Sequence, residues 1–114
     1  MANGRILVIA PEIDLRRSLE FALEAEGFLV TVRADIDLNL DLLDGSFDCT
    51  VLDQAALVGP PDRIISFCAR AKPILLLADN PIHWLSASIT ARVEKPMLGG
   101  ALSNAIGLAL QRSA

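Results

Sequence analysis

Cys49-Thr50-Val51-Leu52 is a nearly continuous apolar run of strand length, and it ends on an acid, Asp53. Three further runs share this character, and they stand at 6–9 (ILVI), 28–32 (FLVTV) and 74–77 (ILLL). Continuous apolar runs are typical of strands that are covered on both faces of a parallel sheet, whereas half-exposed strands alternate apolar and polar residues. We therefore expect four buried parallel strands.

The segments between these runs have helical character. The first has an apolar stripe and a charged side, and Gly27 supplies a left-handed stop. Segment 35–44 also fits an exposed strand, but a parallel sheet needs a crossover there, so we expect a helix. The expected helices cover 15–27, 35–44, 61–71, about 80–88 and 97–112, with a fifth strand at about 91–94. The inward residues are Leu15, Leu19, Ala22 and Leu23 in the first helix, and Ile64, Ile65, Phe67 and Cys68 in the third.

This order of elements predicts one α/β domain over residues 1–114. Five βα units give a doubly wound sheet of five parallel strands with helices on both faces, a three-layer sandwich. Ligands of such sheets bind beyond the carboxyl ends of the strands. The residues at these ends are Ala10-Pro11-Glu12, Asp53-Gln54, Ala78-Asp79 and Lys95-Pro96.

Composition excludes several classes of protein. Of the 114 residues, 53% are hydrophobic and 21% are charged, and the formal net charge is −4. The acidic balance and the lack of a Lys/Arg cluster argue against nucleic-acid binding. No apolar run is long enough to cross a membrane, and the N-terminus lacks the pattern of a signal peptide, so we expect a cytoplasmic protein.

The two cysteines and the histidine do not form a recognisable catalytic or metal-binding motif. Cys49 and Cys68 lie within apolar stretches and have no His nearby, so we expect packed, reduced thiols rather than a disulfide or a zinc site. His83 is the only histidine, and a surface residue is a simpler interpretation than a phosphohistidine. No strand is followed by a glycine-rich phosphate cradle, which disfavours flavin or nucleotide binding.

Two strand-end motifs are specific, namely DCTVLD at 48–53 and VEKP at 93–96. With ILVI at 6–9, the helix at 15–28 and PILLLA at 73–78, the chain resembles the receiver domain of two-component response regulators, which has a flavodoxin-like fold. The resemblance implies that Asp53 accepts a phosphoryl group from a histidine kinase. It implies that Lys95 pairs with the phosphoryl oxygens.

Four functional positions depart from the receiver pattern. Ala10-Pro11 replaces the acid pair that holds Mg²⁺, Ala78 replaces the switch hydroxyl, and Arg92 replaces the switch aromatic. Mg²⁺ requires hard oxygen ligands, and phosphoryl transfer depends on neutralising charge on the phosphoryl oxygens. With Lys95 left alone for that task, we expect little or no Mg²⁺-dependent phosphorylation and no resident cofactor.

Two hypotheses remain open for the strand-end site. In the first, the chain is a pseudo-receiver, a binding module rather than an enzyme, and Asp53 with Lys95 is a structural ion pair. In the second, Asp53 is a genuine phosphoacceptor, and Glu12 or Asp79 helps it to hold Mg²⁺. Against the second, Glu12 lies where a helix begins and Asp79 reads as a helix N-cap.

The last helix lies in a stretch without charge, from Pro96 to Gln111. Leu98, Leu102, Ile106 and Ala109 fit a core-facing side, and Gly99, Ser103 and Gly107 repeat on another face, where a second surface can approach closely. Asp53 and Ala78 are 25 residues apart and Ala78 and Lys95 are 17 apart, which predicts shortened third and fourth helices. We expect a partner at the small-residue face, either a histidine kinase or other signalling protein or a second copy. Packing within the domain is the alternative.

Overall fold

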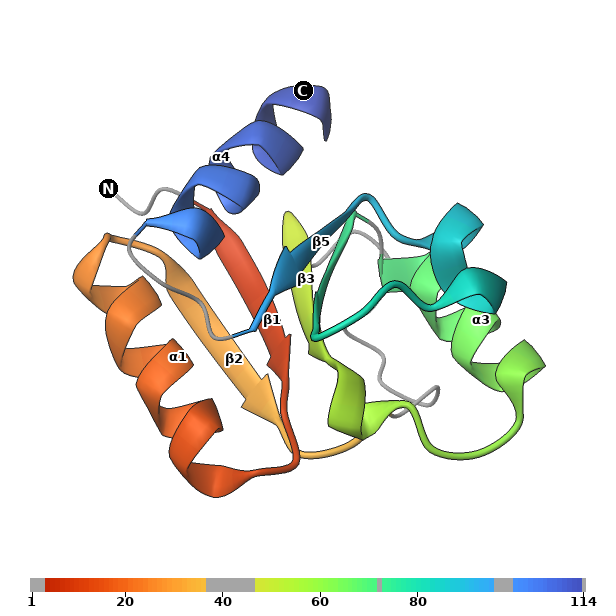
Figure 1. The fold of residues 1–114 in the computed structure, drawn as a ribbon. Helices are drawn as coiled ribbons and strands as arrows, with labels where there is room; N and C mark the ends of the chain where they lie inside the picture. Colours follow the sequence, from red (N-terminus) through yellow and green to blue (C-terminus); the bar gives the residue numbers. More distant parts are fainter. Residues whose placement is uncertain (1–3, 37–46, 72, 96–99, 114) are drawn as a thin grey trace.

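The computed structural model describes residues 4–36, 47–71, 73–95 and 100–113, and it contains a parallel sheet of five strands in the order β2-β1-β3-β4-β5 (Figure 1). The strands are β1 (Arg5–Ile9), β2 (Leu29–Arg33), β3 (Cys49–Asp53), β4 (Ile74–Ala78) and β5 (Ala91–Glu94). Each apolar run of the sequence forms a strand, and the fifth strand lies where it was expected. The flavodoxin-like doubly wound fold is confirmed.

The register aligns the carboxyl ends of the central strands. Ile9 pairs with Leu52 across β1 and β3, and Asp53 pairs with Leu77 across β3 and β4. Ala78 pairs with Glu94 across β4 and β5. The residues that follow these strands therefore meet at one edge of the sheet, which is where ligands of this fold class bind.

Two layers of helix enclose the sheet (Figure 1). On one face lie α1 (Ile13–Ala25) and α4 (Ala101–Ser113), and on the other lie α3 (Pro61–Ala71) and the short 3-10 helix η2 (His83–Ser88). Alternate residues of β1, β3 and β4 are buried in the two resulting cores. The strands are continuously apolar because both of their faces are covered.

Helix α1 begins and ends at residues that the sequence singled out. Glu12 is its N-cap, and Gly27, with φ of +93°, follows the last turn in the left-handed region. Leu19 and Leu23 are buried as predicted. Ala22 is exposed, so its placement on the inward stripe was wrong.

Helix α3 has the predicted bounds, and Ile64, Phe67 and Cys68 are buried. The inward placement of Ile65 was wrong, because this side chain is 38% exposed. An apolar stripe at positions 64, 65, 67 and 68 is wider than the face that the sheet covers. Ile65 lies on the margin of that face.

The expected helix at about 80–88 is a shorter 3-10 helix. It starts at His83 after an extended Ile82, and no side chain caps it. The N-cap prediction for Asp79 was therefore wrong. The predicted helix at 35–44 and the first turn of the helix at 97–112 lie largely outside the described residues, while the remainder of the last helix is α4.

Both cysteines are buried and free, as expected. Burial raises the pKa of the Cys49 thiol to about 12 and that of the Cys68 thiol to about 11, so both remain protonated at neutral pH. Among the described residues, no helix is long and apolar enough to span a membrane.

Candidate functional site

Asp53 is the last residue of β3 and lies buried at the carboxyl edge of the sheet. It also caps the 3-10 helix η1 (Gln54–Ala56), because its Oδ2 accepts the backbone N–H of Ala55 at 3.1 Å. Strand alternation places its side chain on the same face as Ala10 and Val51, toward α1 and α4. The carboxylate is thus held in one orientation by the backbone that follows it.

Lys95 forms an ion pair with Asp53, between Nζ and Oδ1. The Asp53 side chain is only 2% exposed and that of Lys95 is 23% exposed. Oδ1 accepts no hydrogen bond of regular geometry within the described part of the chain, so the ammonium group is its one described partner there. A carboxylate so deeply buried depends on this cation, because loss of one partner of a buried pair costs about 3–5 kcal/mol.

Ala10-Pro11 lies where the resemblance implies a metal-binding acid pair. Ala10 is fully buried, and its N–H donates to the carbonyl of Arg33 at 3.0 Å. Arg16 Nη1 donates to the carbonyl oxygens of Ala10 and Pro11, at 2.9 and 3.2 Å. A guanidinium group from α1 therefore holds this loop by its backbone carbonyls, a contact for which the sequence contains no signal.

Glu12, a candidate metal ligand, uses its carboxylate to cap α1. Its two oxygens accept the backbone N–H groups of Asp14 at 3.1 Å and of Leu15 at 2.6 Å. A negative charge at a helix N-terminus also interacts favourably with the helix dipole. The interpretation of Glu12 as a helix-start residue is confirmed.

Asp79, the other candidate ligand, forms a reciprocal pair with Gln54. Gln54 Nε2 donates to Asp79 Oδ2 at 2.9 Å, and Asp79 N–H donates to Gln54 Oε1 at 3.2 Å. The pair joins the loop after β4 to η1. Gln54 is a site residue that the sequence does not reveal, because a lone Gln after a strand is not distinctive.

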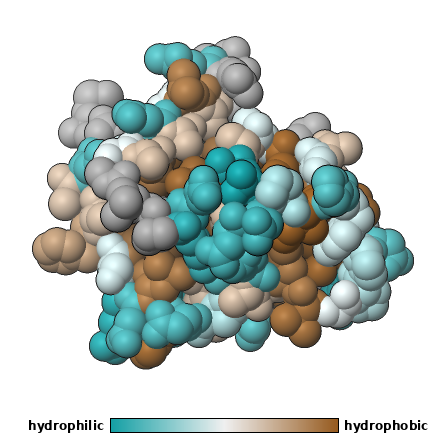
Figure 2. Space-filling model, viewed as in Figure 1, coloured by the Kyte–Doolittle hydropathy of each residue, from teal (hydrophilic) through white to brown (hydrophobic). Residues whose placement is uncertain are grey.

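Arg92 lies on β5, where the resemblance implies a switch aromatic. Its Nη1 donates to the carbonyl oxygens of Ala78, at 3.1 Å, and Asp79, at 3.4 Å. Ala78 itself is buried and carries no hydroxyl. Hydrophilic side chains gather over β5 in the middle of the face seen in Figure 2.

The described residues at this edge do not fit a magnesium site. Within residues 4–36, 47–71, 73–95 and 100–113, no three His, Cys, Asp or Glu side chains are grouped closely enough to hold a metal ion. The carboxylates of Asp53, Glu12 and Asp79 bond to an ammonium group, to helix N–H groups and to an amide, respectively. Mg²⁺ would have to compete with these partners, and of the three carboxylates only that of Asp53 is buried.

The small-residue face of the last helix is only partly free. Ser103 donates to Glu26 of α1, so its hydroxyl is used within the domain. Gly107 faces open space, beside a Leu108 that is 59% exposed. Leu102, Ile106 and Ala109 are buried as predicted, and Gly99 and Leu98 lie outside the described residues.

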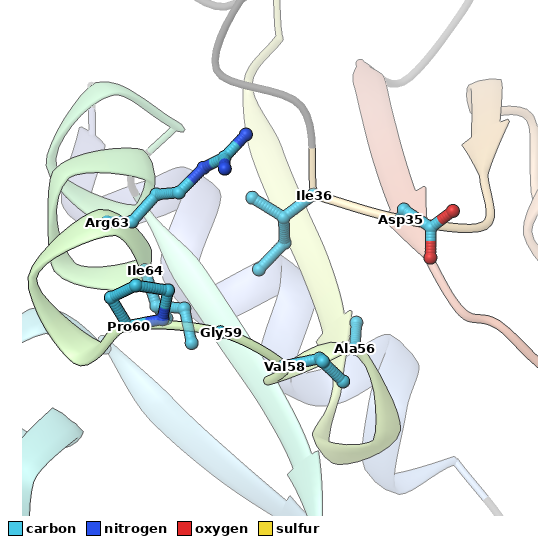
Figure 3. Close-up of a pocket in the computed structure, with 8 residues that line it drawn as sticks. All are labelled: Asp35, Ile36, Ala56, Val58, Gly59, Pro60, Arg63 and Ile64. Atoms are coloured by element: carbon cyan, nitrogen blue, oxygen red, sulfur yellow. The ribbon is translucent and has the colours of Figure 1, made fainter.

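A hollow of about 220 Å³ lies between the loop before α3 and the residues that follow β2 (Figure 3). Ile36, Ala56 and Ile64 give it an apolar lining, and Arg63 stands at its rim (Figure 3). No residue from the strand-end positions of β1, β4 or β5 lines it. No pattern in the sequence predicts this hollow.

No protein-family model and no curated protein matches the sequence. Solved structures do match it. Full-length FixJ from B. japonicum is 26% identical, with a TM-score of 0.81 over 99% of this chain and 60% of that chain. A response regulator receiver domain protein from Clostridium thermocellum is 23% identical, with a TM-score of 0.79 over 98% of this chain and 96% of that chain.

A third match is the receiver domain of a sensor histidine kinase from Pseudomonas aeruginosa, in which a magnesium ion is coordinated in the active site cleft. It is 18% identical, with a TM-score of 0.79 over 96% of this chain and 99% of that chain. The second and third of these structures are receiver domains, and the chain shares the fold of all three. It spans less than two thirds of the full-length FixJ chain.

Proposed function

We propose that the chain is a receiver-like domain of a two-component signalling pathway that works in the cytoplasm by protein–protein contact. It acts as a signalling module rather than an enzyme, with little or no Mg²⁺-dependent phosphorylation of Asp53. One observation carries this proposal, namely that the carboxylates of Asp53, Glu12 and Asp79 are each engaged by a group of the protein itself. Carboxylates that are engaged in this way are weaker metal ligands, because a metal ion competes with their present partners.

The charge balance at Asp53 supports the same proposal. Phosphoryl transfer relies on positioning and on cations that neutralise the phosphoryl oxygens. Lys95 is already paired with Asp53, and the Nη1 atoms of Arg16 and Arg92 bond to backbone carbonyls. To neutralise a phosphoryl group at Asp53, Lys95, Arg16 or Arg92 would therefore have to leave its present partner.

Phosphorylation at Asp53, with Glu12 or Asp79 helping to hold Mg²⁺, is the competing function. Intact-mass analysis after incubation with acetyl phosphate and Mg²⁺ separates the two. We expect the mass to stay unchanged, while a receiver with an intact acid pair, treated in parallel, gains one phosphoryl group. A gain of that mass in the parent, absent from Asp53→Asn, would refute the pseudo-receiver proposal.

For the partner, we propose a histidine kinase or another signalling protein, or a second copy of the chain, that contacts the outer face of α4. Leu108 is exposed there, and a side chain at Gly107 would meet no atom within 4 Å. Charge-poor apolar surface of this kind is typical of contact sites. In the homodimer, Gly107 would lie where two α4 helices approach each other.

Sedimentation tests the homodimer. Gly107→Arg adds a bulky charge in open space and also removes a helix glycine, so the fold of the monomer should be retained. Ala69→Arg, at an exposed position on α3, is the matched control. We expect a dimer in the parent and the control and a monomer in Gly107→Arg; a monomeric parent would dismiss self-association.

A further inference from the structure

The loop after β4 is tied to elements on both of its sides. From the β3 side, Gln54 and Asp79 exchange two hydrogen bonds, one of them to the backbone N–H of Asp79. From β5, Arg92 donates to the carbonyl oxygens of Ala78 and Asp79. Four hydrogen bonds thus converge on two consecutive residues.

The strand order places the donors and acceptors of these bonds on opposite sides of the loop. β4 lies between β3 and β5 in the sheet, so Gln54 and Arg92 hold the loop from opposite sides. Arg92 pairs in register with Leu76 and reaches toward the carboxyl end of β4, and its side chain is half-buried. A shift of the loop toward either neighbour lengthens the bonds on the other side.

The tied loop leads directly into η2. This short helix is anchored by the buried Leu85 and presents Trp84, the single tryptophan of the chain, with 45% of its surface exposed. No side chain caps η2, so its start is positioned by the loop rather than by a cap of its own. We therefore expect a change in the position of the loop to change the exposure of Trp84.

We propose that these four hydrogen bonds form a strand-end lock, which keeps the loop after β4 and the adjoining η2 surface in one conformation without metal or phosphoryl group. The lock rests on the proposed function, because a domain that signals unphosphorylated needs another means of fixing this loop. Arg92 and Gln54 are its positioning residues. The Asp53–Lys95 pair joins β3 to β5 and is not part of it.

Amide exchange measured by NMR, without metal or phosphodonor, tests the lock. The Asp79 N–H donates to Gln54 Oε1, so we expect this amide to be protected from exchange in the parent. In Gln54→Ala the same amide should exchange about tenfold faster. Arg92→Met should accelerate the same amide several-fold, because the loop is released from β5. Asn80→Ala, on the same exposed loop, and Arg63→Met, on α3, are the matched controls.

Two further measurements distinguish release of the loop from unfolding of the domain. Amides of the central strands, such as those of Val51 and Leu76, should keep their protection in every variant. If Arg92→Met does not fold, Arg92→Lys takes its place in the exchange measurement. Quenching of Trp84 fluorescence should rise in Gln54→Ala and Arg92→Met and stay unchanged in both controls. Equal Asp79 exchange in the parent and Gln54→Ala, with the core protected, would overturn the lock.

The two proposals fail separately. Phosphorylation of the parent would refute the pseudo-receiver proposal without changing Asp79 exchange in the absence of a phosphodonor. Unprotected Asp79 in an unphosphorylated parent would refute the lock alone.

Discussion

The two halves of the carboxyl edge have different chemistry. Around Asp53 and Lys95, an opposite-charge pair occupies the two positions that match the receiver pattern. Around Ala10 and Ala78, the polar side chains that a receiver uses are gone, and guanidinium groups of Arg16 and Arg92 bond to backbone carbonyls instead. The proposed pseudo-receiver function predicts this contrast, with a stabilising charge pair beside fixed contacts at the positions that depart from the receiver pattern.

Of the substitutions at this edge, the removal of Lys95 should cause the largest loss of stability. Lys95→Met leaves the buried Asp53 carboxylate without its cation, so we expect the free energy of unfolding to fall by about 3 kcal/mol, the low end for buried pairs because Lys95 is 23% exposed. Urea denaturation measures it. Asp53→Asn combined with Lys95→Met should recover most of the loss, and a loss no smaller in the double variant would show that the pair is not the cause.

Placing an acid at position 10, where the receiver pattern has one, should make the thermal stability of the chain respond to Mg²⁺. Ala10→Asp places a second carboxylate in a buried position on the face of the sheet that carries Asp53. Without metal we expect a loss of about 2–3 kcal/mol, because a buried charge has no partner. Thermal denaturation should show that Mg²⁺ recovers part of this loss in Ala10→Asp, and Ala10→Asn should lose stability without any response to Mg²⁺.

Cutting the guanidinium contact at the loop after β1 should have a smaller effect. Arg16→Met removes two charge-assisted hydrogen bonds to the backbone carbonyl oxygens of Ala10 and Pro11, so we expect a loss of about 1–2 kcal/mol. Arg17→Met, at an exposed position one residue along α1, should change stability by less than about 0.5 kcal/mol. Equal losses in the two variants would show that Arg16 does not hold the loop.

The strands and the site position of Asp53 could be predicted because they depend on local patterns. Continuous apolar runs indicate buried parallel strands, and the residue after such a run lies at the ligand-binding edge. Glu12 was predictable for the same reason, since helix N-caps act on residues that are close in sequence.

The contacts of Arg16, Gln54 and Arg92 could not be predicted from the sequence. Arg16 and Arg92 bond to backbone carbonyls, which any residue type can supply. Gln54 bonds to Asp79, which lies 25 residues away and comes into range only in the folded chain. The error at Asp79 has the same origin. The Asp79-Asn80-Pro81 sequence resembles a helix start, but Gln54 binds the Asp79 carboxylate and the helix begins later, at His83.

Mg²⁺ titration of the parent is the most direct test of the claim that this strand-end site works without a metal. A ligand that binds only the folded state raises the midpoint of thermal unfolding as its concentration exceeds its Kd. We expect the midpoint of the parent, of Asp53→Asn and of Glu12→Gln to show no saturable response to Mg²⁺. A saturable rise in the parent that Asp53→Asn abolishes would contradict the claim and restore Asp53 as a metal ligand.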